Sequence, residues 1–109
     1  MSAGALDRRL QFRRDLGTVG PLGKAEDWQD LGAPVWGSRR DIGDREKAAA
    51  GTIFAETSAR FQIRASAFAR GIRPADRLLC DGLLWEVLGL KEIGRGDRIE
   101  ITASARRDG

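Results

Sequence analysis

The chain has 109 residues, a net charge of +3 and a pI near 9.7, and its length suits one domain with a modest core. It contains no histidine and one cysteine, Cys80, which excludes histidine-based catalysis, histidine zinc ligands and an internal disulfide, and fits a reducing compartment. No stretch approaches the ~20 apolar residues of a membrane span, and the N-terminus lacks the apolar segment of a signal peptide, so we expect neither.

The first predicted strand lies within residues 4–14. Leu10 and Phe12 fall on one face of an extended chain there, while Arg9 and Arg13 fall on the other. Basic side chains on an outer strand face can contact phosphate or an acidic partner. They can equally remain in solvent and prevent edge-to-edge pairing with another strand, and both interpretations stay open at this point.

The next part of the chain is less regular. The glycines and the proline within residues 15–25 predict a flexible loop. Residues 26–31, around Trp28, fit either a short strand or an irregular arm. Residues 33–42 are a better strand, and Pro34 near the start of that strand suggests an edge position in the sheet.

Residues 43–57 break the alternating pattern and form the longest predicted connection. Asp44 is suited to cap a short helix that Gly51 ends, although two turns alone are marginal in water. Loops of this length in small domains tend to be functional or disordered. The segment contains charged residues whose charges nearly cancel: Asp44, Arg45, Glu46, Lys47 and Glu56.

The second half of the chain alternates more regularly. Residues 58–66 and 98–105 each predict a strand with one apolar face. Between them, Asp81-Gly82 separates two apolar runs and suits the positive φ angles of a two-residue type I′ hairpin turn. A second hairpin turn is predicted at residues 94–97. The inward positions of these strands define the predicted core: Phe61, Ile63, Trp85, Val87, Ile99 and Ile101.

The second strand of the Asp81-Gly82 hairpin is mostly apolar on both faces. Leu84 and Leu88 fall on the face opposite Trp85, so we expect this strand to be central in the sheet or to lie at an interface. Cys80 ends the preceding strand and is predicted to be a buried, inert thiol.

Short alternating runs and fourteen glycines together indicate an all-β domain. The chain contains no residue set for catalysis or metal binding, so we predict no enzyme and no cofactor. The tripeptide at residues 95–97 matches a cell-adhesion motif that a glycine-flanked turn also produces by chance. Trp28 and Trp36 are the aromatic residues placed to stack on exposed bases. A small monomeric β-barrel that binds nucleic acid is therefore the alternative function.

The order of several short motifs resembles one known family. The opening run A-G-A-L-D-R-R-L-Q-F-R-R, residues 3–14, is similar to the start of the phage head–tail joining proteins, the adaptors and stoppers of tailed phages and gene transfer agents. Further similar motifs follow in the order of that family: Val35-Trp36-Gly37, Gly43 to Glu46, Phe61-Gln62-Ile63-Arg64, Asp76-Arg77-Leu78, Asp81-Gly82 and Trp85-Glu86-Val87. The resemblance spans residues 3–105. The chain departs from the family at Trp85, where Tyr or another aromatic residue is expected, and at Gly37, where Ala is more usual.

The resemblance implies a single domain over residues 1–109, built as a small antiparallel β-barrel of about six or seven strands. It implies a structural protein, without enzymatic activity or cofactor, that forms a ring of about six or twelve copies in the neck of a virion or gene transfer agent particle. The implied partners are a portal or adaptor protein on the head side, a tail terminator or tail tube on the other, and packaged double-stranded DNA in the lumen, with no membrane. Assembly would take place in the cytoplasm of the bacterial host.

In such a ring the loop at residues 43–57 would project into the channel and help to retain DNA, as a stopper or adaptor does. Outward charged side chains are the candidates for contacts with neighbouring subunits or partners, where charge pairs set register more than affinity. These candidates are Arg9, Arg13, Arg60, Arg64, Asp76 and Arg77.

Overall fold

The structure is a computed structural model that describes residues 5–43 and 56–106. Its strands are β1 (Arg8–Asp15), β2 (Val19–Gly20), β3 (Gly23–Lys24), β4 (Trp28–Asp30), β5 (Val35–Asp41), β6 (Glu56–Arg64), β7 (Arg77–Cys80), β8 (Leu83–Ile93) and β9 (Arg98–Arg106), with the helix α2 (Ala67–Arg70) between β6 and β7.

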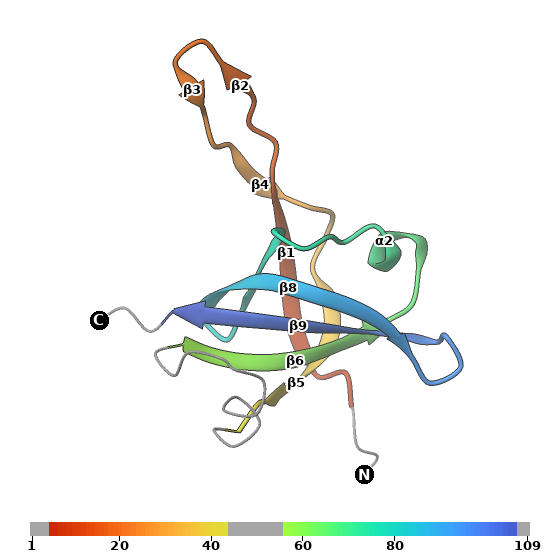
Figure 1. Ribbon diagram of the computed structural model, residues 1–109. Helices are drawn as coiled ribbons and strands as arrows, with labels where there is room; N and C mark the ends of the chain where they lie inside the picture. Colours follow the sequence, from red (N-terminus) through yellow and green to blue (C-terminus); the bar gives the residue numbers. More distant parts are fainter. Residues whose placement is uncertain (1–4, 44–55, 107–109) are drawn as a thin grey trace.

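A closed antiparallel barrel forms the body of the protein (Figure 1). The seven-stranded sheet has the order β4-β1-β5-β6-β9-β8-β7, and β1 pairs with β7 as well, which closes the ring of strands from β1 to β7. Closure leaves no unpaired edge among these strands, and so removes sites for unwanted strand addition. The all-β barrel that the sequence predicts is therefore confirmed.

The core fills the interior of the barrel. The six side chains that the alternating pattern places inward are all buried, and Trp85 and Phe61 are fully enclosed. These two rings meet edge to face, with their centroids 5.1 Å apart, and Phe61 lies opposite Ile101 on β9. Leu10 and Phe12 of β1 complete the interior from the other side. Apolar burial of this kind is the main stabilising contribution in a small domain.

Both predicted hairpin turns are present. Asp81 and Gly82 have φ angles of 53° and 75°, as a type I′ turn requires, and Cys80 pairs with Leu83 across it. Gly94 and Gly96 also adopt positive φ in the turn between β8 and β9. β8 lies between β7 and β9, so it is central in the sheet as expected, although Leu84 and Leu88 on its outer face are exposed.

Pro34 does not mark an edge strand. β5 pairs with β1 on one side and with β6 on the other, so the predicted edge position is wrong. The proline lies just before the first residue of β5, where its missing N–H removes no bond of the sheet.

Two further connections differ from the sequence prediction. Residues 15–25 contain the short hairpin β2–β3 and are not a structureless loop. Ala67–Arg70 form the helix α2, which the sequence analysis did not predict. Ser66 caps its start, because the Ser66 hydroxyl accepts a hydrogen bond from the backbone N–H of Ala69 at 3.0 Å. Within the described ranges, no helix is long and apolar enough to cross a membrane.

An arm projects from the barrel (Figure 1). It comprises the end of β1, the β2–β3 hairpin and β4, which are residues 13–30. β4 pairs with β1 through Arg13↔Asp30, so the base of the arm continues the sheet of the barrel. The tip of the arm contains exposed apolar side chains, which the sequence pattern did not single out.

Candidate functional site

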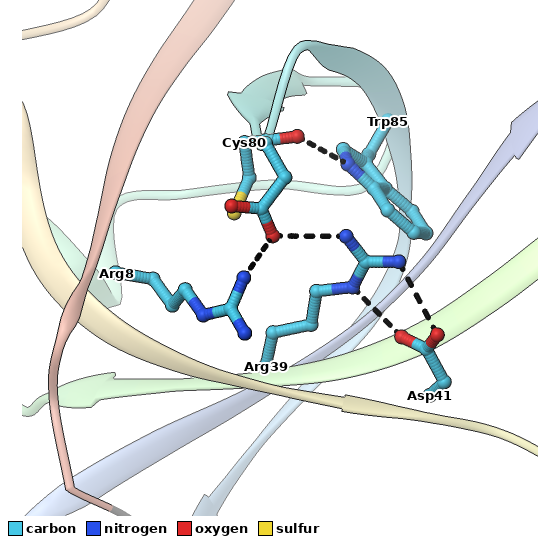
Figure 2. A network of polar contacts seen from close by, with 6 residues as sticks. Arg8, Arg39, Asp41, Cys80 and Trp85 are labelled. Atoms are coloured by element: carbon cyan, nitrogen blue, oxygen red, sulfur yellow. Dashed lines mark hydrogen bonds and ion pairs between the residues drawn. The ribbon is translucent and has the colours of Figure 1, made fainter.

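A network of charged side chains lies beside the buried Trp85 (Figure 2). Its centre is the carboxylate of Asp81, which accepts hydrogen bonds from Arg8 Nη1 at 2.6 Å and from Arg39 Nη1 at 2.9 Å. Arg39 also binds both carboxylate oxygens of Asp41, at 2.7 and 3.3 Å, and its guanidinium lies 4.7 Å from the ring centroid of Trp85. The network thus joins β1, β5 and the β7–β8 turn above the buried tryptophan.

The electrostatics of this network are balanced. Its two guanidiniums and two carboxylates carry no net charge. The hydrogen bond from Arg8 is the largest cause that holds the pKa of the Asp81 carboxyl below its usual value, and Arg39 adds to it. Because Asp81 and Arg8 are partly exposed, solvent screens their attraction and the pair adds little to stability. Its main effect is to fix where three strands meet.

Cys80 lies beside this network, and its thiol is expected to be unreactive. Burial is the main cause that raises the pKa of its thiol to about 11, and the neighbouring Asp81 carboxylate adds to the shift. The thiol is therefore protonated at neutral pH and is a poor nucleophile. Cys80 also provides the backbone carbonyl that accepts the Trp85 indole N–H at 3.2 Å, which satisfies a buried donor.

A second ion pair fixes the segment between α2 and β7. Arg14 binds both carboxylate oxygens of Asp76, at 2.9 and 2.7 Å, and donates to the carbonyl of Gly71 at 2.8 Å. Asp76 is buried and also accepts the backbone N–H of Arg73 at 2.8 Å. Asp76 thus binds groups of its own chain, and its predicted contact with a partner stays a prediction.

The tryptophans expected to stack on bases are each covered on one face by an arginine of the same chain. The guanidinium of Arg9 lies 4.5 Å from the centroid of the exposed Trp36 ring. That of Arg77 lies 4.0 Å from the centroid of Trp28, at the base of the arm. Arg13 donates to the Trp28 carbonyl at 2.9 Å. Arg9 and Arg77 therefore contact aromatic rings of their own chain, whereas Arg13 contacts a backbone carbonyl.

The remaining interface candidates lie on β6. The guanidinium of Arg60 lies 4.0 Å from the carboxylate of Glu100, which Lys91 also approaches at 3.5 Å. Arg64, the last residue of β6, lines a cavity. Arg60 and Arg64 therefore lie in different surroundings on the same strand.

Most residues of the predicted channel loop lie outside the part of the chain that the structure describes. Asp44, Arg45, Glu46 and Lys47 lie outside the described residues. Glu56 and Thr57, which the sequence analysis assigned to the loop, instead begin β6, where Glu56 pairs with Arg106. Alternation alone could not show this, because neither residue is apolar.

A hollow in the surface lies between the segment that precedes β1, the strands β5 and β6, and α2. It has a volume of about 740 Å³ and is lined mainly by apolar side chains, with Asp7 and Arg64 among them. Its apolar lining residues are Leu6, Val35, Trp36, Ile63 and Phe68. Among the described residues, no group of three or more His, Cys, Asp or Glu is placed to hold a metal ion.

Comparison with known proteins identifies the same architecture elsewhere. The sequence profile of the phage head completion proteins matches residues 1–106. The solution structure of a protein from Shigella flexneri 2a is similar over 100% of both chains, with a TM-score of 0.76 and 20% identity. A chain from the virion of a native gene transfer agent particle is similar over 93% of this chain and 94% of its own, with a TM-score of 0.67 and 22% identity. No curated protein matches the sequence. At these identities the structural similarities establish the fold.

Proposed function

We propose that this chain, which belongs to the phage head completion protein family, forms a ring in the neck of a virion or gene transfer agent particle and joins the DNA-filled head to the tail. The observation that carries this proposal is the family match over residues 1–106, which includes every strand of the barrel and the whole arm. The assembly of copies into a ring is the part of this proposal that does not follow from the fold of a single chain.

The chemistry of the described surface supports a structural role. The thiol of Cys80 is protonated, and the carboxylates of Asp76 and Asp81 are held by arginines, so these groups are engaged in holding the fold together. Closure pairs the six barrel strands from β1 to β7 with one another, which limits unwanted strand addition to the barrel and suits a subunit that assembles into a ring of fixed size.

The partners follow from this location. One face of the ring would contact the portal or an adaptor protein, the other a tail terminator or tail tube, and the lumen would contain double-stranded DNA. The candidates for subunit and partner contacts remain Arg9, Arg13, Arg60, Arg64, Asp76 and Arg77. Residues 43–55 remain the candidate channel loop. Its nearly cancelling charges would obstruct DNA without binding its phosphates strongly, since each phosphate contact would slow release.

The proposal is tested by deleting the gene from a particle-producing strain. We expect heads and tails that do not join, and we expect purified protein added to the lysate to restore joined particles. A Trp85→Ala protein, which lacks the central core side chain, is the matched negative control for that addition. Joined, infectious particles in the deletion strain would show that the protein does not connect head and tail.

A further inference from the structure

The tip of the arm presents apolar side chains that nothing in the described chain covers. Val19 is 80% exposed and Leu22 is fully exposed, although both belong to a formed hairpin. A Cβ atom added at Gly20 or Gly23 would meet no atom within 4 Å, so the tip is surrounded by open space. Exposed apolar side chains that are grouped on one projecting element indicate a contact with another molecule.

The arm is braced at its base, so its tip is held at a fixed place. The Asp15 carboxylate accepts the backbone N–H groups of Gly17 at 2.8 Å and Asp27 at 2.9 Å, and it lies 3.1 Å from Lys24 Nζ. These bonds, with Asp27 first, lower the pKa of Asp15 to about 2, so the brace is charged at neutral pH. A preorganised arm loses less entropy on docking than a flexible loop would.

The receiving surface is the cavity between β5, β6 and α2. Its volume of about 740 Å³ lies in the range that holds a bound ligand or a few side chains, and its walls include Val35, Trp36 and Phe68. The arm extends beyond the barrel on a side away from α2 (Figure 1), so the tip does not fill the cavity of its own chain. Each molecule therefore carries one projecting apolar tip and one open apolar cavity at different places.

We propose that the arm tip, residues 19–23, inserts into this cavity on a second copy of the same chain. Two different surfaces of one protein that fit each other make a head-to-tail contact, and repetition of such a contact closes into a ring when the rotation between copies permits it. The proposal rests on the ring of the proposed function and specifies which surfaces join its subunits. It requires Leu22 of one copy to lie near Asp7, one of the residues that line the cavity, in the next.

Cysteine cross-linking in assembled particles tests this contact. The double variant Leu22→Cys/Asp7→Cys should give, after oxidation of purified tailless heads, a ladder of covalent oligomers that continues beyond the dimer. Leu22→Cys/Leu84→Cys is the matched control, because Leu84 is exposed on β8, outside the cavity lining. The native Cys80 is buried and should not react. A ladder that stops at the dimer, or one equally strong in the control, would overturn the head-to-tail contact.

A second variant separates this inference from the proposed function. Leu22→Asp should fold normally and should lose its place in the neck, whereas Leu84→Asp should keep it. If Leu22→Asp still forms complete rings in joined particles, the arm contact is wrong and the connector function stands. If the wild-type protein is absent from the neck, the proposed function itself fails.

Discussion

Replacement of Trp85 by alanine tests whether the barrel interior is packed as described. The indole is fully buried, meets Phe61 edge to face at 5.1 Å, donates to the Cys80 carbonyl and lies beneath the Arg39 guanidinium. Loss of a large aromatic side chain from a core costs ~3–5 kcal/mol, and domains of this size have a free energy of unfolding of about 5–15 kcal/mol. We expect Trp85→Ala to lose at least that ~3 kcal/mol and to be partly unfolded at 37 °C.

Equilibrium urea denaturation followed by circular dichroism measures this loss without relying on tryptophan fluorescence. Leu84→Ala is the control, because Leu84 is the neighbouring residue on β8 and points outward with 43% of its surface exposed. Its cost should stay below ~1 kcal/mol. A Trp85→Ala protein whose free energy of unfolding matches that of Leu84→Ala would refute the packing argument, because the indole could not then be enclosed by the barrel.

Four further results are expected. Gly82→Val should destabilise the protein by ~1–3 kcal/mol in the same assay, because φ is 75° there, whereas Gly20→Val, in open space, should be nearly neutral. The pKa of Asp15 is lowered to about 2 in the folded protein, compared with about 4 in the unfolded chain. The stabilisation of the arm by Asp15 is therefore complete above pH ~4 and disappears as the pH falls toward 2. The amide resonance of Gly17 should report this loss in an NMR titration. The isolated protein should be mainly monomeric at micromolar concentration in a sedimentation experiment. It should bind DNA weakly, with an affinity that falls steeply as the salt concentration rises. Tight, salt-resistant binding would favour a nucleic-acid-binding module instead. Replacement of residues 45–55 by a short Gly-Ser linker should leave the barrel folded, since the entropy of loop closure changes slowly with loop length. The DNA in tailless heads should then become sensitive to nuclease. Full retention of DNA would contradict the assignment of this segment as a gate.

The barrel could be predicted because its determinants are local. Alternation placed Phe61 and Ile101 inward, and the barrel interior encloses both. Asp81-Gly82 specified its turn because few other pairs accept positive φ at both positions. Closure of β1 on β7 was not available from pattern alone, since it depends on contacts between residues far apart in sequence, and the resemblance to a barrel family provided it.

The features that the sequence analysis missed depend on tertiary context. Pro34 has the same backbone restriction at an edge as it has just before a central strand, and only the pairing partners of β5 distinguish the two. Asp76 resembles any surface carboxylate until Arg14 is placed against it. The sequence analysis did not predict the hairpin at the arm tip, because glycine and proline near Leu22 are typical of a loop whether or not a hairpin forms.

High-resolution cryo-electron microscopy of the particle neck tests the central claim most directly. The account predicts a closed ring of copies of this barrel between the head and the tail, with residues 43–55 directed toward the DNA channel and each arm tip in the cavity of the adjacent copy. A neck without this barrel, or with copies that make no contact with one another, would contradict the connector function.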